Sequence, residues 1–346
     1  MQDNLKGLAK RVLYRAGYYT VSSRLKGPRS PRLVVLMYHD VLDDADGSNA
    51  RRTDTESPTA AQFSAHAEQL ARRHRVLSIR DATDEIRRGG LREDTVAITF
   101  DDGYASVYAS AYPTLKRLGL PATIFVLTGW MNREAYMWWQ ELRAIAARST
   151  FSCSAVRRVE SILGVPLLSG GRSLLEVRRH FLGAAEPWLR GLDEATLASR
   201  LKELREAALP GMTSLSVHNQ ALTWDQLREM SEGGVELGAH THSHINLRHS
   251  DPEAAAREIM KSKAEIARNT RRDPVGFAYP YGKDVEYYRP AVEILRAEGF
   301  TYACTAIPGV NDSNTDPFYL RRIVVPSTTS AALINRELSL TFLRDA

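Results

Sequence analysis

The sequence lacks several features that define broad classes of protein. It has only two cysteines, Cys153 and Cys304, which excludes a disulfide-rich scaffold. No segment approaches the run of about 18 consecutive apolar residues that a transmembrane helix needs. The N-terminal residues 1–20 lack the apolar core and small-residue cleavage site that are typical of a secretory signal. These absences predict a cytoplasmic protein.

The chain has no large excess of positive or negative charge. The chain has 46 Lys and Arg against 41 Asp and Glu, which gives a net charge of +5 and an isoelectric point near 9.2. Such mild basicity suits an anionic membrane surface or an acidic partner. Nucleic-acid binding needs a concentrated basic patch with interleaved aromatic residues, which the sequence does not show, so we expect no nucleic-acid partner.

The composition is that of a folded globular protein. Hydrophobic residues make up 43% of the chain and charged residues 25%, which excludes a mainly disordered chain. A length of 346 residues predicts two domains, or one large barrel with insertions.

Residues 5–19 have the apolar spacing of an amphipathic helix, and their four Lys and Arg residues supply positive charge on the remaining surface. Such a helix can lie in a membrane interface or pack on the main domain, and the sequence leaves both interpretations open. The linker Lys26–Pro31, rich in helix breakers, follows it. We therefore interpret residues 1–31 as an N-terminal basic amphipathic helix and linker.

Short apolar runs recur along the rest of the chain, and each ends in polar residues. They cover residues 33–38, 96–100, 122–126, 235–239, 275–278, 301–305 and 320–325. Helical patterns lie between them at 104–118, 224–231, 252–269 and 290–298. Strands that alternate with helices predict a parallel barrel or wound sheet, in which chemistry gathers at the C-terminal ends of the strands. The interval of about 135–220 breaks this alternation, and we interpret it as a helical insertion.

Two polar motifs stand at the ends of predicted strands, one at residues 99–103 with two adjacent carboxylates and one at residues 240–244 with three histidines. Each alone also fits a turn or a surface cluster. Two histidines and one carboxylate form a zinc-type ligand set that leaves a position open for water. A second carboxylate can then act as a general base. An extended backbone would instead bring His240, His242 and His244 together as an alternative three-histidine site.

These residues resemble the polysaccharide deacetylases, also called the NodB-homology domain or carbohydrate esterase family 4. The resemblance rests on Thr-Phe-Asp-Asp-Gly at 99–103, on the His-Ser/Thr-x-x-His motif at 240–244, and on Pro280-Tyr281-Gly282. The last matches the end of the family's Arg-x-Pro-Tyr-Gly segment. The resemblance covers about residues 32–130 and 221–325.

What the resemblance implies for the fold is a distorted TIM-like (β/α) barrel. The catalytic domain would span residues 32–346, with the helical insertion at about 135–220 interrupting it. The activity implied is the metal-dependent removal of acetyl groups from amino sugars.

The resemblance also assigns roles to residues of the motifs. Asp101 would be the general base that takes a proton from the water at the metal. Asp102, His240 and His244 would hold a divalent metal, Zn²⁺ first and Co²⁺ or Ni²⁺ as alternatives. The backbone N–H of Tyr281 would stabilise the oxyanion of the transition state.

Two departures from the family pattern affect the expected site. The family's Arg falls at Ala278, so its role of orienting the base would pass to Arg321 or Arg322. The family's late Leu-x-His motif, which supplies the general acid, is absent, and no histidine follows His249. His39 closes the first apolar run and is therefore our candidate for the acid.

Four further residues are candidates for binding the substrate. Tyr104 lies beside the aspartate pair, and Pro280 belongs to the third motif. Trp138 and Trp139 stand near the start of the insertion, where their rings could stack on a sugar or anchor the insertion to the barrel.

The sequence therefore predicts a metal-dependent N-deacetylase that acts on an N-acetylhexosamine in a polysaccharide or a lipid-linked saccharide. The basic helix at residues 5–19 places it, as an expectation, at the cytoplasmic face of a membrane as a peripheral protein. An O-acetyl carbohydrate esterase with the same site and a non-catalytic glycan-binding relative are the alternatives.

Overall fold

The computed structural model describes residues 30–43, 57–135, 137–167, 173–192, 194–212, 215, 221–247, 250–283, 289–326, 329–335 and 338. The helix expected at residues 5–19 lies outside them, so its structure and its membrane contact stay predictions. The described residues form two compact units, one with the residues up to Ala135 and from Ala221 onward, and the other within Tyr136–Gln220. Within the described ranges, no helix is long and apolar enough to cross a bilayer.

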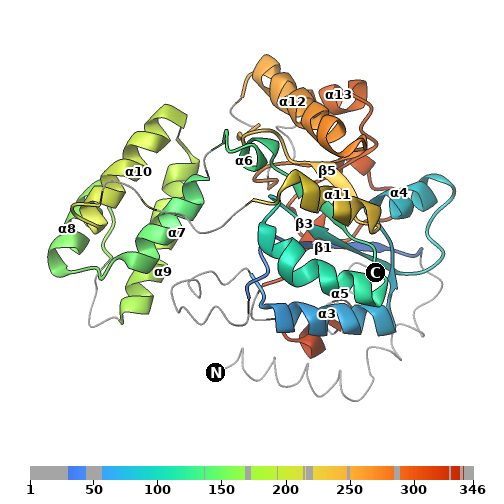
Figure 1. Cartoon of the computed structure of the whole chain (residues 1–346), viewed down its shortest axis with the longest axis horizontal. Coiled ribbons are helices and arrows are strands. Elements are labelled where there is room, and N and C mark those ends of the chain that lie inside the picture. The colour runs from blue at the N-terminus through green and yellow to red at the C-terminus, as the bar shows by residue number, and fades with distance from the viewer. Residues whose placement is uncertain are drawn as a thin grey trace. The chain divides into compact units, whose positions relative to one another are not determined.

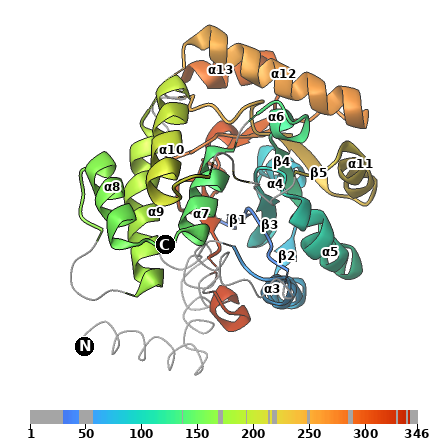
Figure 2. The same cartoon turned by 60° about the vertical axis from the view of Figure 1, so that its left-hand side comes forward.

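The first unit is built on a parallel sheet that curls into a nearly closed barrel (Figures 1 and 2). The strands are β1 (Leu33–Tyr38), β2 (Arg75–Val76), β3 (Thr95–Phe100), β4 (Thr123–Val126), β5 (Glu236–Ala239), β6 (Gly276–Ala278), β7 (Tyr302–Cys304) and β8 (Arg322–Val324). Their order is β7-β6-β5-β4-β3-β1-β8, with β2 paired to β3 beside this path. A parallel bridge between Cys304 and Leu320 joins the two ends. The expected distorted (β/α) barrel is confirmed.

Helices surround the strands of this unit (Figure 2). They are α3 (Ala60–Arg73), α4 (Ile79–Arg87), α5 (Tyr112–Leu118), α6 (Thr128–Met131), α11 (Trp224–Glu232), α12 (Pro252–Thr270) and α13 (Arg289–Ala297). A π-helical turn, Val107–Ala111, runs directly into α5, so the helix expected over 104–118 is helical from residue 105 and contains a π segment. The second unit contains α7 (Trp138–Arg148), α8 (Cys153–Leu163), α9 (Leu174–Arg190) and α10 (Glu194–Ala208).

The ends of the helices follow from local sequence signals. Thr223 caps α11 by accepting a hydrogen bond from the backbone N–H of Gln226, whose side chain accepts from the N–H of Thr223 in return. Asp251 caps α12 in front of Pro252, which occupies the first helical position, where its missing N–H costs nothing. Gly119 ends α5 with a φ of 62°, a left-handed conformation that glycine adopts without strain.

The alternation of side chains along each strand determines what enters the barrel. Val96, Ile98 and Phe100 of β3 point outward into the core beneath the helices, whereas Ala97 belongs to the apolar interior. Because successive side chains of a strand point to opposite faces, the inward positions continue through Thr99 to residue 101. The alternation of side chains along β3 therefore places Asp101 on the inward face of the barrel, at the C-terminal end of the strand.

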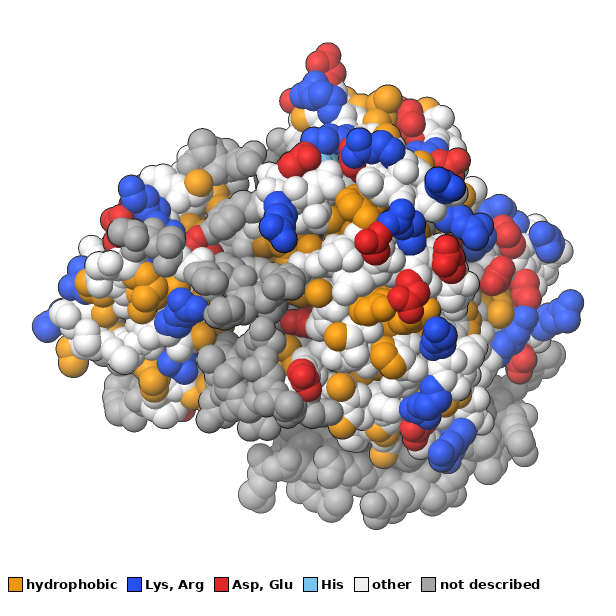
Figure 3. Space-filling view, in the orientation of Figure 1, with side chains coloured by type: hydrophobic (Ala, Val, Ile, Leu, Met, Phe, Trp, Pro, Cys, Tyr) orange, Lys and Arg blue, Asp and Glu red, His pale blue; other side chains and the backbone are white. Residues whose placement is uncertain are grey.

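Acidic and basic side chains are interspersed among the described residues on the face that Figure 3 shows. Around α12, for example, Arg257 pairs with Glu253 at 3.7 Å and Arg268 with Glu265 at 2.6 Å. These basic side chains are therefore paired with acidic neighbours on the same helix.

The two cysteines should differ in reactivity in the folded protein. Burial raises the pKa of the Cys304 thiol to about 12, whereas Cys153 is exposed at the start of α8. Because the thiolate is the reactive form, a thiol reagent at about pH 8 should label one cysteine per native chain and two after denaturation. The Cys153→Ser variant should react only when unfolded, and fast native labelling of this variant would contradict a closed barrel interior.

Candidate metal centre and active site

The C-terminal ends of three strands of the barrel bring the motif residues together. Asp101 and Asp102 follow β3, His240 follows β5, and residues 279–282 follow β6, while β4 lies between β3 and β5. The backbone N–H of His240 donates to the carbonyl of Val126, and that of Leu127 donates to the carbonyl of Asp102. The strand ends are therefore joined by backbone hydrogen bonds directly beneath the polar side chains.

Asp102, His240 and His244 form a cluster that could hold a metal ion. One ligand atom from each lies within 4.8 Å of the other two. The Nε2 atoms of His240 and His244 are 3.5 and 3.8 Å from Oδ1 of Asp102. Zinc bonds of about 2.0–2.1 Å in a tetrahedron separate the ligand atoms by about 3.3 Å, so the two distances to Asp102 fit such an ion with only a small contraction.

A hydrogen bond determines which ring nitrogen of His240 faces the cluster. Its Nδ1 lies 2.7 Å from the carbonyl oxygen of Ala278. Since a carbonyl can only accept, Nδ1 carries the proton and Nε2 presents its lone pair toward Asp102. Bonds of this kind fix the tautomer and the orientation of histidines that bind metals.

Left-handed backbone conformations are concentrated at this cluster. Of the seven residues other than glycine with positive φ among the described ranges, four are Asp102 (72°), Thr241 (65°), His244 (59°) and Tyr281 (63°). Residues in such conformations are strained and gather at functional sites. At Asp102 the backbone turns at the end of β3, whereas a continued strand would send the two adjacent carboxylates to opposite faces.

Gly103 completes that turn. Its φ is 86°, and a Cβ atom there would lie 3.2 Å from Cγ1 of Val126 on the neighbouring strand. A side chain at this position would therefore meet both backbone strain and crowding, which explains why a glycine follows the aspartate pair.

Asp101 forms a buried ion pair with Arg322. The two side chains are about 3% and 1% exposed, and two hydrogen bonds of 2.6 and 2.7 Å join the guanidinium to both carboxylate oxygens. Nε of Arg322 donates to the carbonyl of Thr305 at 2.7 Å. Burial by itself raises the pKa of Asp101, but the charge of Arg322 holds it below its usual value. Asp101 is therefore ionised at neutral pH.

The structure distinguishes between the two arginines that the sequence offered for orienting the base. Arg322 points into the barrel, whereas Arg321, its neighbour on the chain, is exposed. Ala278, at the position of the family's Arg, contributes its backbone carbonyl to His240 instead. The guanidinium at Asp101 thus comes from the last strand of the barrel.

His39 and Asp40 follow β1 on the same rim. His39 is half-buried, and its charge is among the influences that lower the pKa of Asp101. Asp40 is buried and accepts a hydrogen bond from the hydroxyl of Ser106. His39 therefore lies within electrostatic reach of the carboxylate, and its role as general acid stays a prediction.

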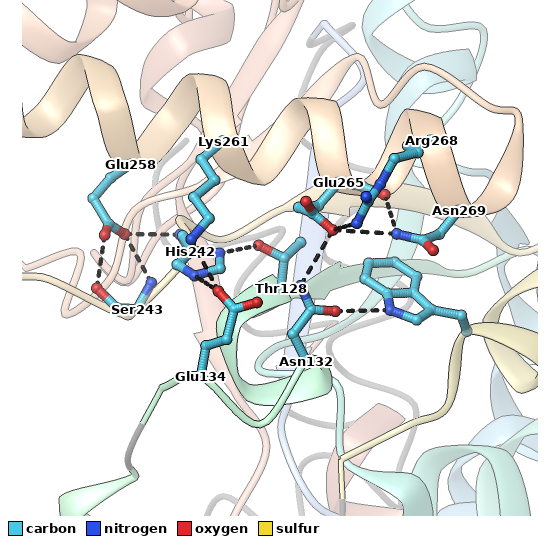
Figure 4. Close-up of polar contacts among 11 residues, drawn as sticks. Thr128, Asn132, Glu134, His242, Ser243, Glu258, Lys261, Glu265, Arg268 and Asn269 are labelled. Carbon is cyan, nitrogen blue, oxygen red and sulfur yellow. Dashed lines mark hydrogen bonds and ion pairs between the residues drawn. The ribbon is translucent and has the colours of Figure 1, made fainter.

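His242 does not join the metal cluster (Figure 4). Its Nε2 lies 3.1 Å from the carboxylate of Glu134, and its Nδ1 lies 2.9 Å from the hydroxyl of Thr128. The positive φ values at Thr241 and His244 show that the backbone between the histidines is not extended. The three-histidine alternative is therefore not formed. Sequence reasoning missed Thr128 and Glu134, because neither belongs to a motif.

The remaining candidates lie in different surroundings. Tyr104 is only 3% exposed. Its ring meets that of the half-buried Trp130 edge-on, with the ring centroids 5.0 Å apart, so Trp130 covers it. Pro280 is buried. The ring of Tyr281 packs against that of His244, with the ring centroids 4.7 Å apart. The substrate and oxyanion roles proposed for Tyr104, Pro280 and Tyr281 stay predictions.

Trp138 and Trp139 belong to the second unit. They open α7, both are buried, and their rings meet edge-on with centroids 5.7 Å apart. Their proposed contact with the substrate also stays a prediction.

The barrel and its cluster define a class of protein. The family model of the polysaccharide deacetylases matches residues 88–153 and 195–303. The chain belongs to this family of hydrolases, which confirms the resemblance that its motifs indicate.

Individual relatives share this assignment. The Bacillus subtilis protein YxkH, classed with the polysaccharide deacetylases, is 21% identical over 314 residues, which are 90% of this chain and 78% of YxkH. The poly-beta-1,6-N-acetyl-D-glucosamine N-deacetylase of Escherichia coli is 29% identical over 130 residues, 33% of this chain and 19% of that protein. The Streptococcus pyogenes deacetylase PplD, solved with acetate, shares the fold with a TM-score of 0.59 and 16% identity, over 90% of this chain and 99% of that chain.

Arg322→Met should lower the free energy of unfolding by about 3–5 kcal/mol, because it leaves the carboxylate of Asp101 buried without its counterion. Arg321→Met is the matched control, since this exposed neighbour should change stability by less than about 0.5 kcal/mol. Urea unfolding measures both. Similar stabilities of the two variants would contradict the importance of the ion pair.

The same pair of variants tests the effect of pH. The pKa of Asp101 is lower in the folded protein than its ordinary value of 3.8. The contribution of the ion pair is therefore complete above that value and is lost as the pH falls through the folded-state pKa. The difference in the free energy of unfolding between Arg322→Met and wild type should therefore become smaller in acid. The measurement is made on metal-free protein.

Proposed function

We propose that this protein is a metal-dependent N-deacetylase that hydrolyses the acetamide of an N-acetylhexosamine within a glycan. The observation that carries the proposal is the Asp102–His240–His244 cluster beside the ionised, buried Asp101. An amide carbonyl is unreactive, so its hydrolysis needs polarisation, an activated water and a proton for the leaving amine. The rim of the barrel offers a group for each need.

Asp102, His240 and His244 would hold the metal, with Zn²⁺ first and Co²⁺ or Ni²⁺ as alternatives. When bound, such an ion polarises the acetyl carbonyl and lowers the pKa of water by several units. This chemistry matters for the choice of base, because Arg322 keeps the pKa of Asp101 low and a carboxylate of low pKa is a weak base. A more acidic water compensates for that weakness.

Asp101 would accept the proton of the attacking water. Its two bonds to Arg322 fix the plane of the carboxylate and keep it ionised, so the base needs no reorganisation before it acts. His39 would supply a proton to the departing amine, and the backbone N–H of Tyr281 would donate to the oxyanion. Their place at the strand ends, after β1 and after β6, supports both assignments.

The name of the Escherichia coli relative supports a polymer of N-acetylglucosamine as the substrate to test first. The basic amphipathic pattern of residues 5–19 supports a lipid-linked saccharide as a second choice, with the protein peripheral at the cytoplasmic face of a membrane.

Metal content tests the ligand set directly. Wild type dialysed against zinc and then against buffer should retain about one equivalent, and Asp102→Ala should retain almost none, because two histidines alone leave the ligand set incomplete. Asp225→Ala, which removes an exposed carboxylate on α11, is the matched control and should retain the metal. If wild type takes up no zinc, the proposal is contradicted, and the alternative of a non-catalytic glycan-binding protein is favoured.

Acetate release tests the chemistry. On N-acetylglucosamine oligomers, His39→Ala should lower kcat by about 10²–10⁴-fold, the usual contribution of a general acid. On an O-acetyl ester the loss should be much smaller, since an alkoxide leaves with less help. Equal losses on both substrates would contradict the role of His39. Ester hydrolysis without any amide hydrolysis by wild type would favour an O-acetyl esterase.

A further inference from the structure

The segment that joins the two histidine ligands must hold an unfavourable conformation. Thr241 and His244 both have positive φ, and this double turn sends the His244 ring back toward Asp102. The hydroxyl of Thr241 accepts a hydrogen bond of 3.0 Å from the N–H of His244, which closes the turn. A strained turn persists only where its surroundings over-determine it, so other contacts must hold residues 242 and 243.

Glu258 supplies three of those contacts (Figure 4). One carboxylate oxygen accepts the backbone N–H groups of both His242 and Ser243, each at 2.8 Å. The other oxygen accepts the hydroxyl of Ser243 at 2.7 Å. Glu258 projects from α12, a helix of 19 residues, so the loop is fastened to a rigid element. Hydrogen bonds to an ionised carboxylate are stronger than those between neutral groups.

The same loop is fastened on its other side to α6. The backbone N–H of Gly129 donates to the carbonyl of His242 at 2.8 Å, and the His242 ring lies between Thr128 and Glu134. A Cβ atom on Gly129 would lie 2.5 Å from that carbonyl oxygen, so the approach leaves no room for a side chain. Lys261 of α12 pairs with Glu134 at 2.9 Å and joins the two sides.

We propose that Glu258 is a positioning residue of the metal centre. It contributes no ligand atom to the cluster, but its three hydrogen bonds hold the loop in the turn that directs Nε2 of His244 toward Asp102. Without them the backbone can relax toward an extended form, and His244 moves away from the other two ligands. The inference rests on the proposed function, because it requires that the cluster bind a metal.

Three variants of α12 separate this role from a general structural one. Glu258→Ala removes all three hydrogen bonds. Glu258→Gln retains the pattern, since its amide oxygen can accept both N–H groups and its NH₂ can donate to the hydroxyl of Ser243. Glu253→Ala, which removes an exposed carboxylate of the same helix, is the matched control. The measurements are Zn²⁺ affinity, by competition with a chelator, and thermal unfolding of the metal-free proteins.

Glu258→Ala should bind Zn²⁺ about 10–100-fold more weakly than wild type, the loss typical of a removed hydrogen-bond partner of a metal site. Glu258→Gln should stay within a few-fold of wild type, and Glu253→Ala should be unchanged. In Co²⁺-loaded protein the visible absorption of Glu258→Ala should shift, because the ligand geometry changes, while that of Glu258→Gln should not.

An unchanged Zn²⁺ affinity in folded Glu258→Ala would overturn the inference and leave the proposed function intact. A loss in Glu258→Gln as large as that in Glu258→Ala would also overturn it, since hydrogen-bond geometry would then not set the affinity. If Glu258→Ala does not fold, Ser243→Ala replaces it, and a normal affinity and cobalt spectrum there would count against the inference. Wild type that binds no Zn²⁺ overturns the proposed function and this inference together.

Discussion

The closure of the barrel depends on the ion pair between Asp101 and Arg322. The chemistry proposed for its rim depends on the same pair. Each charge, buried alone, would cost several kcal/mol, so each requires the other. Arg322 belongs to β8, which has only three residues and pairs with β1 alone, yet its guanidinium reaches β3 through Asp101 and the end of β7 through the carbonyl of Thr305. The seam between β7 and β8 otherwise has the bridge at Leu320 and a few backbone bonds. The same side chain therefore closes the seam and orients Asp101, the proposed base.

This arrangement constrains the catalytic machinery that can be built around it. A carboxylate bound to a guanidinium is well oriented and ionised at neutral pH, but it is a poor base. Such a base requires an acidified water next to it, and the Asp102–His240–His244 cluster stands at the adjacent strand ends. The strained turns at Asp102, Thr241 and His244 bring these groups to one place, and the hydrogen bonds around the Thr241–His244 turn stabilise it.

The sequence predicted much of this architecture because buried parallel strands appear as apolar runs. All seven runs correspond to strands, whereas β2, with two residues, is too short to produce a pattern. The motifs predicted the three residues of the cluster. They did not distinguish Arg321 from Arg322, which differ in the structure because one is exposed and the other is buried against Asp101. Leu320 lies in the barrel interior and Ile323 packs against the outer core, so apolar neighbours stand on both sides of the arginine pair. Glu258 and Glu134 could not be found from sequence, because a glutamate on or near a helix usually faces solvent and their partners are distant in the chain.

The distance along the chain between the two members of the ion pair has a consequence for biosynthesis. Asp101 precedes Arg322 by 221 residues. At a translation rate of about 5–20 residues per second, the aspartate leaves the ribosome roughly 10–45 s before its counterion is made. During that interval the nascent barrel has an open edge and a carboxylate that cannot be buried ionised. Chaperones that hold unpaired strand edges would therefore find their substrate in the nascent chain until β8 has been synthesised.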